Sequence, residues 1–89
     1  MQASKSKRIR RTIELRNGIK EMYFCEIENI VLLLLSDVIQ ILDLSCGEVV
    51  VTIKKFSYPR SVRLSKCGSF FVGYFSDNTV SLFDTKRGF

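Results

Sequence analysis

Short apolar runs alternate with polar turn groups along most of the chain. From residue 11 onward, Val, Ile, Phe, Leu and Tyr recur at every second position in runs of four to seven residues. A period of two places successive side chains on opposite faces of a strand, and no segment has a helical period. The pattern therefore predicts an all-β protein of about seven short strands in up-and-down order. The turn groups between them are Arg16-Asn17-Gly18, Ser36-Asp37, Ser45-Cys46-Gly47, Ser57-Tyr58-Pro59, Ser65-Lys66-Cys67-Gly68 and Ser76-Asp77-Asn78.

The chain also resembles itself. A shift of 41 residues brings strand-like segments and a turn glycine into register: residues 39–43 fall on 80–84, Ile30-Val31 on Phe71-Val72, and Gly47 on Gly88. One gap aligns two further segments: Met22 and Phe24 with Val62 and Leu64, and Thr12-Ile13 with Thr52-Ile53. A period of about 40–45 residues with four strands is typical of β-propeller blades.

The second repeat resembles a WD repeat. Residues 61–74 are similar to the innermost strand, the tight "SPDG" turn and the second strand of that family, and residues 76–84 to its "DDxTVxLWD" segment. The first repeat, Ile19 to Asp43, is a weaker version with a shortened turn at Ser36-Asp37. Leu42 and Phe83 stand where the family has Trp, and its Gly-His pair is missing, so the resemblance does not extend to a subfamily.

The resemblance implies an all-β fold of two antiparallel WD-type propeller blades that form an incomplete ring. The implied strands are Arg11–Leu15 as an outer strand, Ile19–Phe24, Asn29–Leu35, Val38–Leu42 and Glu48–Ile53 as one blade, and Arg60–Leu64, Ser69–Phe75 and Thr79–Phe83 as three strands of another. We expect a disordered basic arm over 1–10, then the outer strand and first repeat over 11–47, and the second repeat over 48–89. Gly73, inside a strand, is expected to allow close packing between blades.

Propellers typically have about 4–8 blades, so two blades need partners to close a ring. We expect the chain to be a fragment of a longer protein, with self-assembly as the alternative.

The positive charge lies at the N-terminus. Residues 1–20 carry seven basic side chains and one acidic one, whereas the rest of the chain is close to neutral. The arm predicts either contact with RNA or DNA phosphates or a nuclear-import signal, with a solubilising terminus as the alternative. Its candidate residues are Lys5, Lys7, Arg8, Arg10 and Arg11. The longest apolar run, Ile30–Leu35, is far shorter than the roughly 20 residues of a membrane span, and we expect no membrane association.

Candidate chemistry is sparse. The chain has three widely spaced cysteines and no histidine, which argues against a zinc site, a disulfide framework and a histidine-activated nucleophile. Asp43 and Asp84 end equivalent strands, so we interpret them as turn carboxylates. We therefore expect no catalytic residues, no metal, no cofactor and no enzymatic activity. The cysteine usage indicates a reduced, intracellular protein, and the basic arm favours the nucleus or nucleolus over the cytoplasm.

The segment from Lys54 to Arg60 combines cations with aromatic residues, directly before the innermost strand of the second repeat. The resemblance implies that this loop lies on the propeller face that most often binds partners, and exposed Tyr and Arg are typical interface anchors. We expect Lys55, Tyr58, Arg60 and Arg16 to contact partners; the alternative is a solvated loop with Phe56 in the core.

The expected function is that of a non-enzymatic protein–protein interaction scaffold in a multi-subunit complex. The alternative is an RNA-associated component of a ribonucleoprotein or ribosome-biogenesis complex that uses the basic arm.

Overall fold

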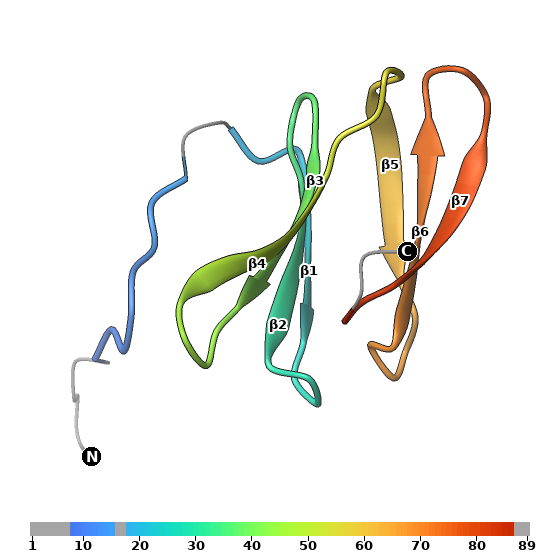
Figure 1. Ribbon diagram of the computed structural model, residues 1–89. Coiled ribbons are helices and arrows are strands. Elements are labelled where there is room, and N and C mark those ends of the chain that lie inside the picture. The colour runs from blue at the N-terminus through green and yellow to red at the C-terminus, as the bar shows by residue number, and fades with distance from the viewer. Residues whose placement is uncertain (1–7, 16–17, 87–89) are drawn as a thin grey trace, which may run out of the picture.

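The computed structural model describes residues 8–15 and 18–86, which form two antiparallel sheets and no helix (Figure 1). The first sheet has the order β1-β2-β3-β4 and the second the order β5-β6-β7. The strands are β1 (Glu21–Cys25), β2 (Ile30–Leu34), β3 (Ile39–Asp43), β4 (Glu48–Ile53), β5 (Pro59–Leu64), β6 (Phe70–Phe75) and β7 (Val80–Asp84). The seven strands predicted after residue 18 are confirmed, with ends that differ by two residues at most. The described residues contain no helix that could cross a membrane.

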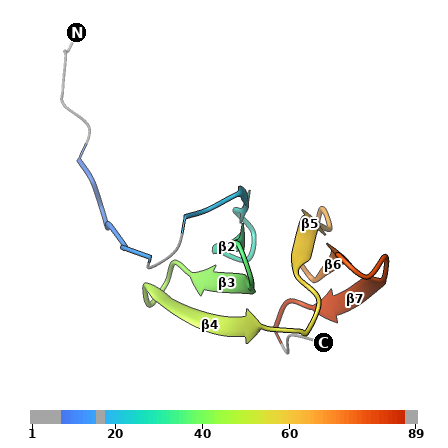
Figure 2. The ribbon, with the colours of Figure 1, turned by 90° about the horizontal axis from the view of Figure 1, so that it is seen from above.

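The two sheets face each other, as the view from above shows (Figure 2). Leu32, Leu34 and Ile39 of the first sheet are fully buried against a layer from the second that includes Phe71 and Phe75. The Phe71 and Phe83 rings stack with their centroids 5.0 Å apart. Apolar side chains that alternate along each strand thus meet across the gap between the sheets, and this contact is the main core.

Each sheet has two distinct faces. We call the face of the first sheet that packs against the second its leading face, and the face of the second sheet that receives it its trailing face. The leading face of the first sheet carries Ile30, Leu32, Leu34, Ile39 and Ile41, and the trailing face of the second carries Val62, Leu64, Phe71, Phe75 and Phe83. By alternation along the strands, the trailing face of the first sheet carries Met22, Phe24, Val31, Leu33 and Leu42, and the leading face of the second carries Phe70, Val72, Tyr74, Val80 and Leu82.

The N-terminal segment lies on the trailing face of the first sheet. Ile13 and Leu15 pack against the cluster that contains Val31 and Leu33. The predicted strand at Arg11–Leu15 is wrong, because residues 11–15 are not part of either sheet. A segment that lies across a sheet face buries its apolar side chains there, but it cannot join the hydrogen-bond ladder, which is available only at a sheet edge.

The two sheets are equivalent pair by pair. Opposed residues in β2 and β3, such as Leu32↔Ile41 and Leu34↔Ile39, correspond to Val72↔Leu82 and Tyr74↔Val80 in β6 and β7. The offset is 41 residues from β3 to β7 but 40 from β2 to β6, because the β2–β3 turn is one residue shorter. The sequence alignment of Ile30-Val31 with Phe71-Val72 is therefore wrong by one position, whereas the shortened turn at Ser36-Asp37 is confirmed.

The ends of the third strands match as well. Asp43 Oδ1 accepts a hydrogen bond from the Ser45 N–H at 2.8 Å, and Asp84 Oδ1 accepts one from the Lys86 N–H at 2.8 Å. The next residues donate their backbone N–H groups to equivalent turns: Leu44 to the Asn29 carbonyl in the β1–β2 turn at 3.0 Å, and Thr85 to the Ser69 carbonyl in the β5–β6 turn at 2.9 Å. Both aspartates thus stabilise turns, which confirms their structural interpretation. Gly88, predicted to match Gly47, lies outside the described residues.

Gly73 lies in β6 on the face that packs against Ile39 of the first sheet. A Cβ atom there would lie 3.1 Å from Ile39 Cδ1 of the opposite sheet and 3.1 Å from the Phe75 ring. The prediction that this glycine allows close packing between sheets is confirmed. By contrast, a Cβ atom on Gly18 would meet nothing within 4 Å.

Replacing Gly73 by Val should lower the free energy of unfolding by about 1–3 kcal/mol, because the added methyl groups overpack the inter-sheet core. Gly18→Val is the matched control and should change it by less than about 0.5 kcal/mol. Urea unfolding followed by circular dichroism measures both. Equal stabilities of the two variants would contradict this description of the sheet contact.

Candidate functional site

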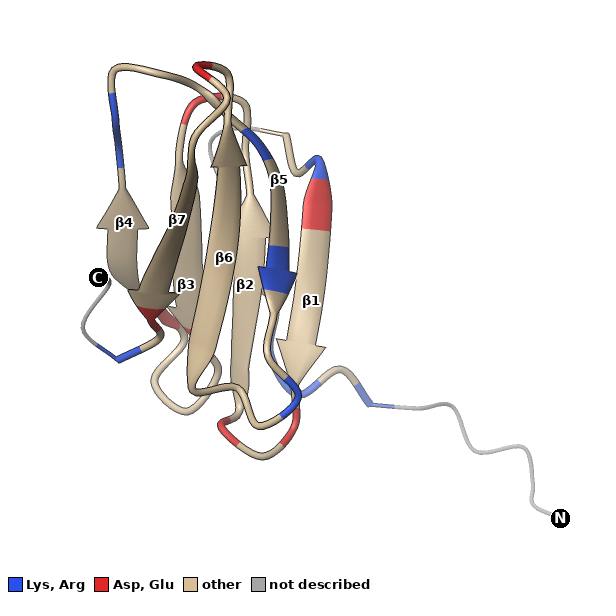
Figure 3. Ribbon diagram, turned by 90° about the vertical axis from the view of Figure 1, so that its right-hand side faces the viewer, with Lys and Arg blue, Asp and Glu red and all other residues tan. Residues whose placement is uncertain are grey.

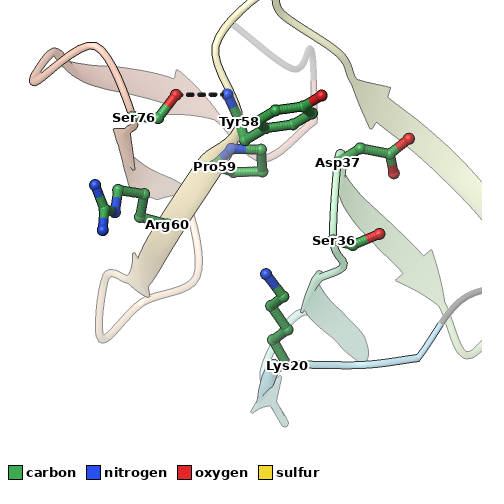
Figure 4. A pocket seen from close by; sticks show the side chains of 7 residues that line it. All are labelled: Lys20, Ser36, Asp37, Tyr58, Pro59, Arg60 and Ser76. Carbon is green, nitrogen blue, oxygen red and sulfur yellow. Dashed lines mark hydrogen bonds between the residues drawn. The ribbon is translucent and has the colours of Figure 1, made fainter.

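A hollow of about 640 Å³ opens between the sheets, at the end where the β4–β5 loop passes from one sheet to the other (Figure 1). Four separate segments line it (Figure 4). Lys20 precedes β1, Ser36 and Asp37 lie in the β2–β3 turn, Tyr58, Pro59 and Arg60 stand where β5 begins, and Ser76 follows β6. The hollow therefore exists only because the two sheets stack.

The loop before β5 holds its aromatic residues out toward solvent. The Tyr58 N–H donates to Ser76 Oγ at 2.9 Å, and the Ser76 N–H donates to the Tyr58 carbonyl at 2.8 Å. These two bonds fix the backbone, while the Tyr58 side chain stays 62% exposed. Phe56 is fully exposed, so the alternative prediction that it enters the core is wrong.

The charged groups of the hollow lack intramolecular partners. Among residues 8–15 and 18–86 one ion pair forms, between Arg63 and Glu21, and Lys20, Asp37 and Arg60 take no part in it. One carboxylate oxygen of Asp37 is buried without a hydrogen-bond partner. The Arg60 side chain extends away from Lys20 and Asp37 (Figure 4). A buried acceptor with no donor is energetically costly, and Asp37 Oδ1 is such a group beside the hollow.

Two of the four predicted partner-binding residues, Tyr58 and Arg60, line this hollow. Lys55 does not: its Nζ donates to Ser81 Oγ at 3.4 Å and lies 4.2 Å from the centroid of the Phe75 ring. Lys55 thus ties the loop to the second sheet. Arg16 lies outside the described residues.

Sequence reasoning missed Lys20, Ser36, Asp37 and Ser76 as lining residues. A signal was present in the sequence. Ser36-Asp37 and Ser76-Asp77 are equivalent turns of the two repeats, and in an up-and-down sheet such turns lie at the same end as the segment before β5, which carries Tyr58. In the second repeat the Asp77 carboxylate accepts hydrogen bonds from the Thr79 hydroxyl at 2.5 Å and the Thr79 N–H at 3.2 Å, and the hydroxyl bond lowers the pKa of Asp77. Asp77-Asn78 is therefore a turn, as predicted, with Asn78 at φ 67°.

The described part of the basic arm lies near the opposite end of the first sheet. Arg8, Arg10 and Arg11 are exposed, and Arg10 and Arg11 line a second hollow of about 530 Å³ together with Asn29 and Leu44. The Arg11 guanidinium packs directly against Gly47. Lys5 and Lys7, the other predicted arm residues, lie outside the described residues.

Nucleophilic groups are few. Cys25 is buried, whereas Cys46 and Cys67 are exposed in turns, as their sequence contexts predict. A hydrogen bond from the Ser69 side chain, followed by further bonds from Ser69 and Ser65, lowers the pKa of Cys67 to about 7. The chain contains no histidine to transfer a proton to or from this thiolate. Within the described ranges, no three His, Cys, Asp or Glu side chains come together in a way that could hold a metal ion.

Comparison with models of known protein families finds no match to this chain, and comparison with curated protein sequences finds none either.

Cys67 should be alkylated by iodoacetamide with a rate that reaches half its maximum near pH 7, because its thiolate is stabilised below the ordinary thiol pKa. Ser69→Ala removes the main stabilising hydrogen bond and should move this midpoint to higher pH. Peptide-resolved mass spectrometry gives the rate at each pH, with Cys46 of the same molecule as the internal reference. A midpoint near pH 8.5 in the unmodified chain, the value of a free thiol, would contradict the assignment.

Proposed function

We propose that the chain is a non-enzymatic protein–protein interaction scaffold built from two WD-type β-propeller blades, which acts within a larger ring in a multi-subunit complex. One observation carries the proposal: the two sheets stack leading face on trailing face, with matching strand pairs and matching aspartates at Asp43 and Asp84. Units related in this way bury their faces only against neighbours of the same kind, and about three or more are needed for stability.

The strand edges fit the same proposal. In the part of the chain that the structure describes, β7 has a neighbour on one side only, whereas its counterpart β3 pairs with both β2 and β4. Residues 11–15 make no backbone hydrogen bond to the rest of the described chain, and Thr12-Ile13 resembles Thr52-Ile53 of β4. β7 thus presents a free edge like the one that β4 fills beside β3, and residues 11–15, which form no strand in this molecule, do not occupy it.

Partner binding is assigned to the hollow between the sheets. Tyr58 offers an exposed aromatic ring in the hollow, and Phe56 is a second exposed ring in the loop that leads to it. Lys20, Arg60 and Asp37 take part in no ion pair among the described residues. Interfaces concentrate their binding energy in such aromatic and arginine anchors, surrounded by polar groups. The partner is therefore a protein segment that covers the Tyr58 ring and meets the charged groups at the hollow.

Tyr58→Ala should weaken partner binding at least tenfold, because truncating an interface anchor commonly costs about 2 kcal/mol. The measurement compares cross-linked and affinity-purified partners of the unmodified chain and of the variant, followed by titration of the captured partner. Ile27→Ala is the matched control, since Ile27 is 77% exposed in the β1–β2 turn at the other end of the molecule. Equal losses in both variants, or no loss in either, would remove the hollow as the binding site.

A second candidate function is favoured by the basic arm. Arg10 and Arg11 converge on the second hollow, and together with Arg8 they form an exposed cationic strip. Under this proposal the chain is an RNA-associated component of a ribonucleoprotein or ribosome-biogenesis complex in the nucleus or nucleolus, and the arm contacts RNA phosphates.

If the arm binds RNA, the affinity for a single-stranded oligonucleotide should fall steeply with salt. Replacing Arg8, Arg10 and Arg11 by Ser should lower the slope of log affinity against log salt by about 2, since each phosphate contact contributes about 0.7. Replacing Lys54, Lys66 and Lys86 by Ser is the charge-matched control and should leave the slope unchanged. Fluorescence anisotropy between 50 and 200 mM salt measures it. Binding that is absent or insensitive to salt would remove this candidate.

A further inference from the structure

The leading face of the second sheet is an exposed copy of a buried surface. In the first sheet, Ile39 and Ile41 are 0% and 1% exposed, because the second sheet covers them. Their counterparts in the second sheet, Val80 and Leu82, are 67% and 65% exposed. Phe70 and Tyr74, the counterparts of Ile30 and Leu34, are 46% and 39% exposed. The sequence thus keeps the apolar pattern of a covered face at positions that no other part of the described chain covers.

The opposite end of the stack carries the complementary surface. The second sheet covers the first with its trailing face, on which Val62 and Leu64 lie beside Phe71. The register makes Met22 and Phe24 the counterparts of Val62 and Leu64 on the first sheet. Met22 and Phe24 are 58% and 59% exposed, whereas Val62 is 1% exposed. One chain therefore ends in an uncovered leading face at one side. At the other side it ends in a trailing face on which Met22 and Phe24 are exposed, while Val31, Leu33 and Leu42 are buried in the cluster against which Ile13 and Leu15 pack.

We propose that the leading face of the second sheet binds the trailing face of the first sheet of a second copy of this chain. The contact repeats, between molecules, the packing that already joins the two sheets within one molecule. It is a heterologous, head-to-tail interface, which continues into a ring or an open series of copies. The inference rests on the stacking part of the proposed function and not on the partner-binding hollow.

Charge and area both fit an apolar partner of this kind. β6 and β7 carry no Lys, Arg, Asp or Glu before Asp84 (Figure 3). Arg63 of β5 pairs with Val72 on the same face, but its guanidinium contacts Glu21 and Tyr23 of the first sheet. The exposed fractions of Phe70, Tyr74, Val80 and Leu82 leave an apolar patch on the order of 400 Å², at the size where patches mark interaction sites. An interface of standard size buries about 800 Å² from each partner, of which somewhat more than half is apolar.

The N-terminal segment packs on the trailing face over Val31, Leu33 and Leu42, so a second copy must displace it. Ile13 and Leu15 cover part of this face, but no backbone hydrogen bond holds residues 11–15 in place. Two half-buried side chains are a weak tether compared with a sheet face, so a second copy can displace them.

The test uses two charge substitutions in the full chain. Leu82→Asp places a carboxylate on the leading face of the second sheet, and Phe24→Asp places one on the trailing face of the first. Both side chains are more than half exposed, so neither substitution disturbs the core of the single molecule. Ile27→Asp is the control, because Ile27 is 77% exposed in a turn outside both faces. Sedimentation velocity at about 1–100 µM measures the size, and circular dichroism checks the fold.

The unmodified chain and Ile27→Asp should sediment as two or more copies of the 10.2 kDa chain. Each face variant alone should self-associate at least a hundredfold more weakly, since a buried unpaired charge is strongly unfavourable. An equimolar mixture of the two face variants should form a heterodimer, because Phe24→Asp keeps an intact leading face and Leu82→Asp an intact trailing face. Formation of that heterodimer also shows that both variants fold.

Three results would overturn the inference. One is a chain that stays monomeric throughout the concentration range. Another is a Phe24→Asp variant that still dimerises while Leu82→Asp does not, which would indicate a symmetric contact between two leading faces. The third is a mixture of folded face variants that stays monomeric. None of these depends on Tyr58, so failure here and loss of partner binding at the hollow are distinguishable.

Discussion

The burial of one sheet face against the next is the contact on which this structure depends. Leu32, Leu34 and Ile39 are shielded from water only because Phe71 and Phe75 lie across from them on the second sheet. Neither sheet has a helix or a third layer among the described residues to cover it from the other side. A single sheet would leave its apolar face exposed to water, so each sheet contributes to the stability of its neighbour.

Polar contacts fix how the sheets are positioned without supplying the driving force. Glu21 of β1 accepts a hydrogen bond from the Val62 N–H at 3.4 Å, and Arg63 contacts both Glu21 and Tyr23 across the gap. Exposed pairs of this kind contribute little energy but select one relative position of two apolar surfaces that could otherwise slide. The hollow around Tyr58 has a defined shape for that reason.

Local patterns predicted most of the fold. The strand at Glu48–Ile53 was correct to the residue, because a β-branched run between a glycine turn and a lysine pair leaves little choice. The segment Arg11–Leu15 has the same alternation, yet it forms no strand, since strand formation needs a free edge that the local sequence does not supply. Lys55 and Phe56 were equally ambiguous: which of two neighbouring side chains packs inward depends on the path of a loop between two sheets, and only their packing decides it.

The shortened β2–β3 turn has a consequence for how such chains can diverge. Which side chains share a face is decided by pairing across the ladder, and the missing residue lies beyond the last pair, Leu34↔Ile39. A deletion in this turn therefore leaves every side chain on its original face of the sheet. The same deletion inside β2 would move the side chains on one side of it to the opposite face. The lengths of the turns can therefore change without disturbing the sheets. Aligning two such sheets by their cross-strand pairs will reveal an equivalence that an alignment at a fixed residue offset misses.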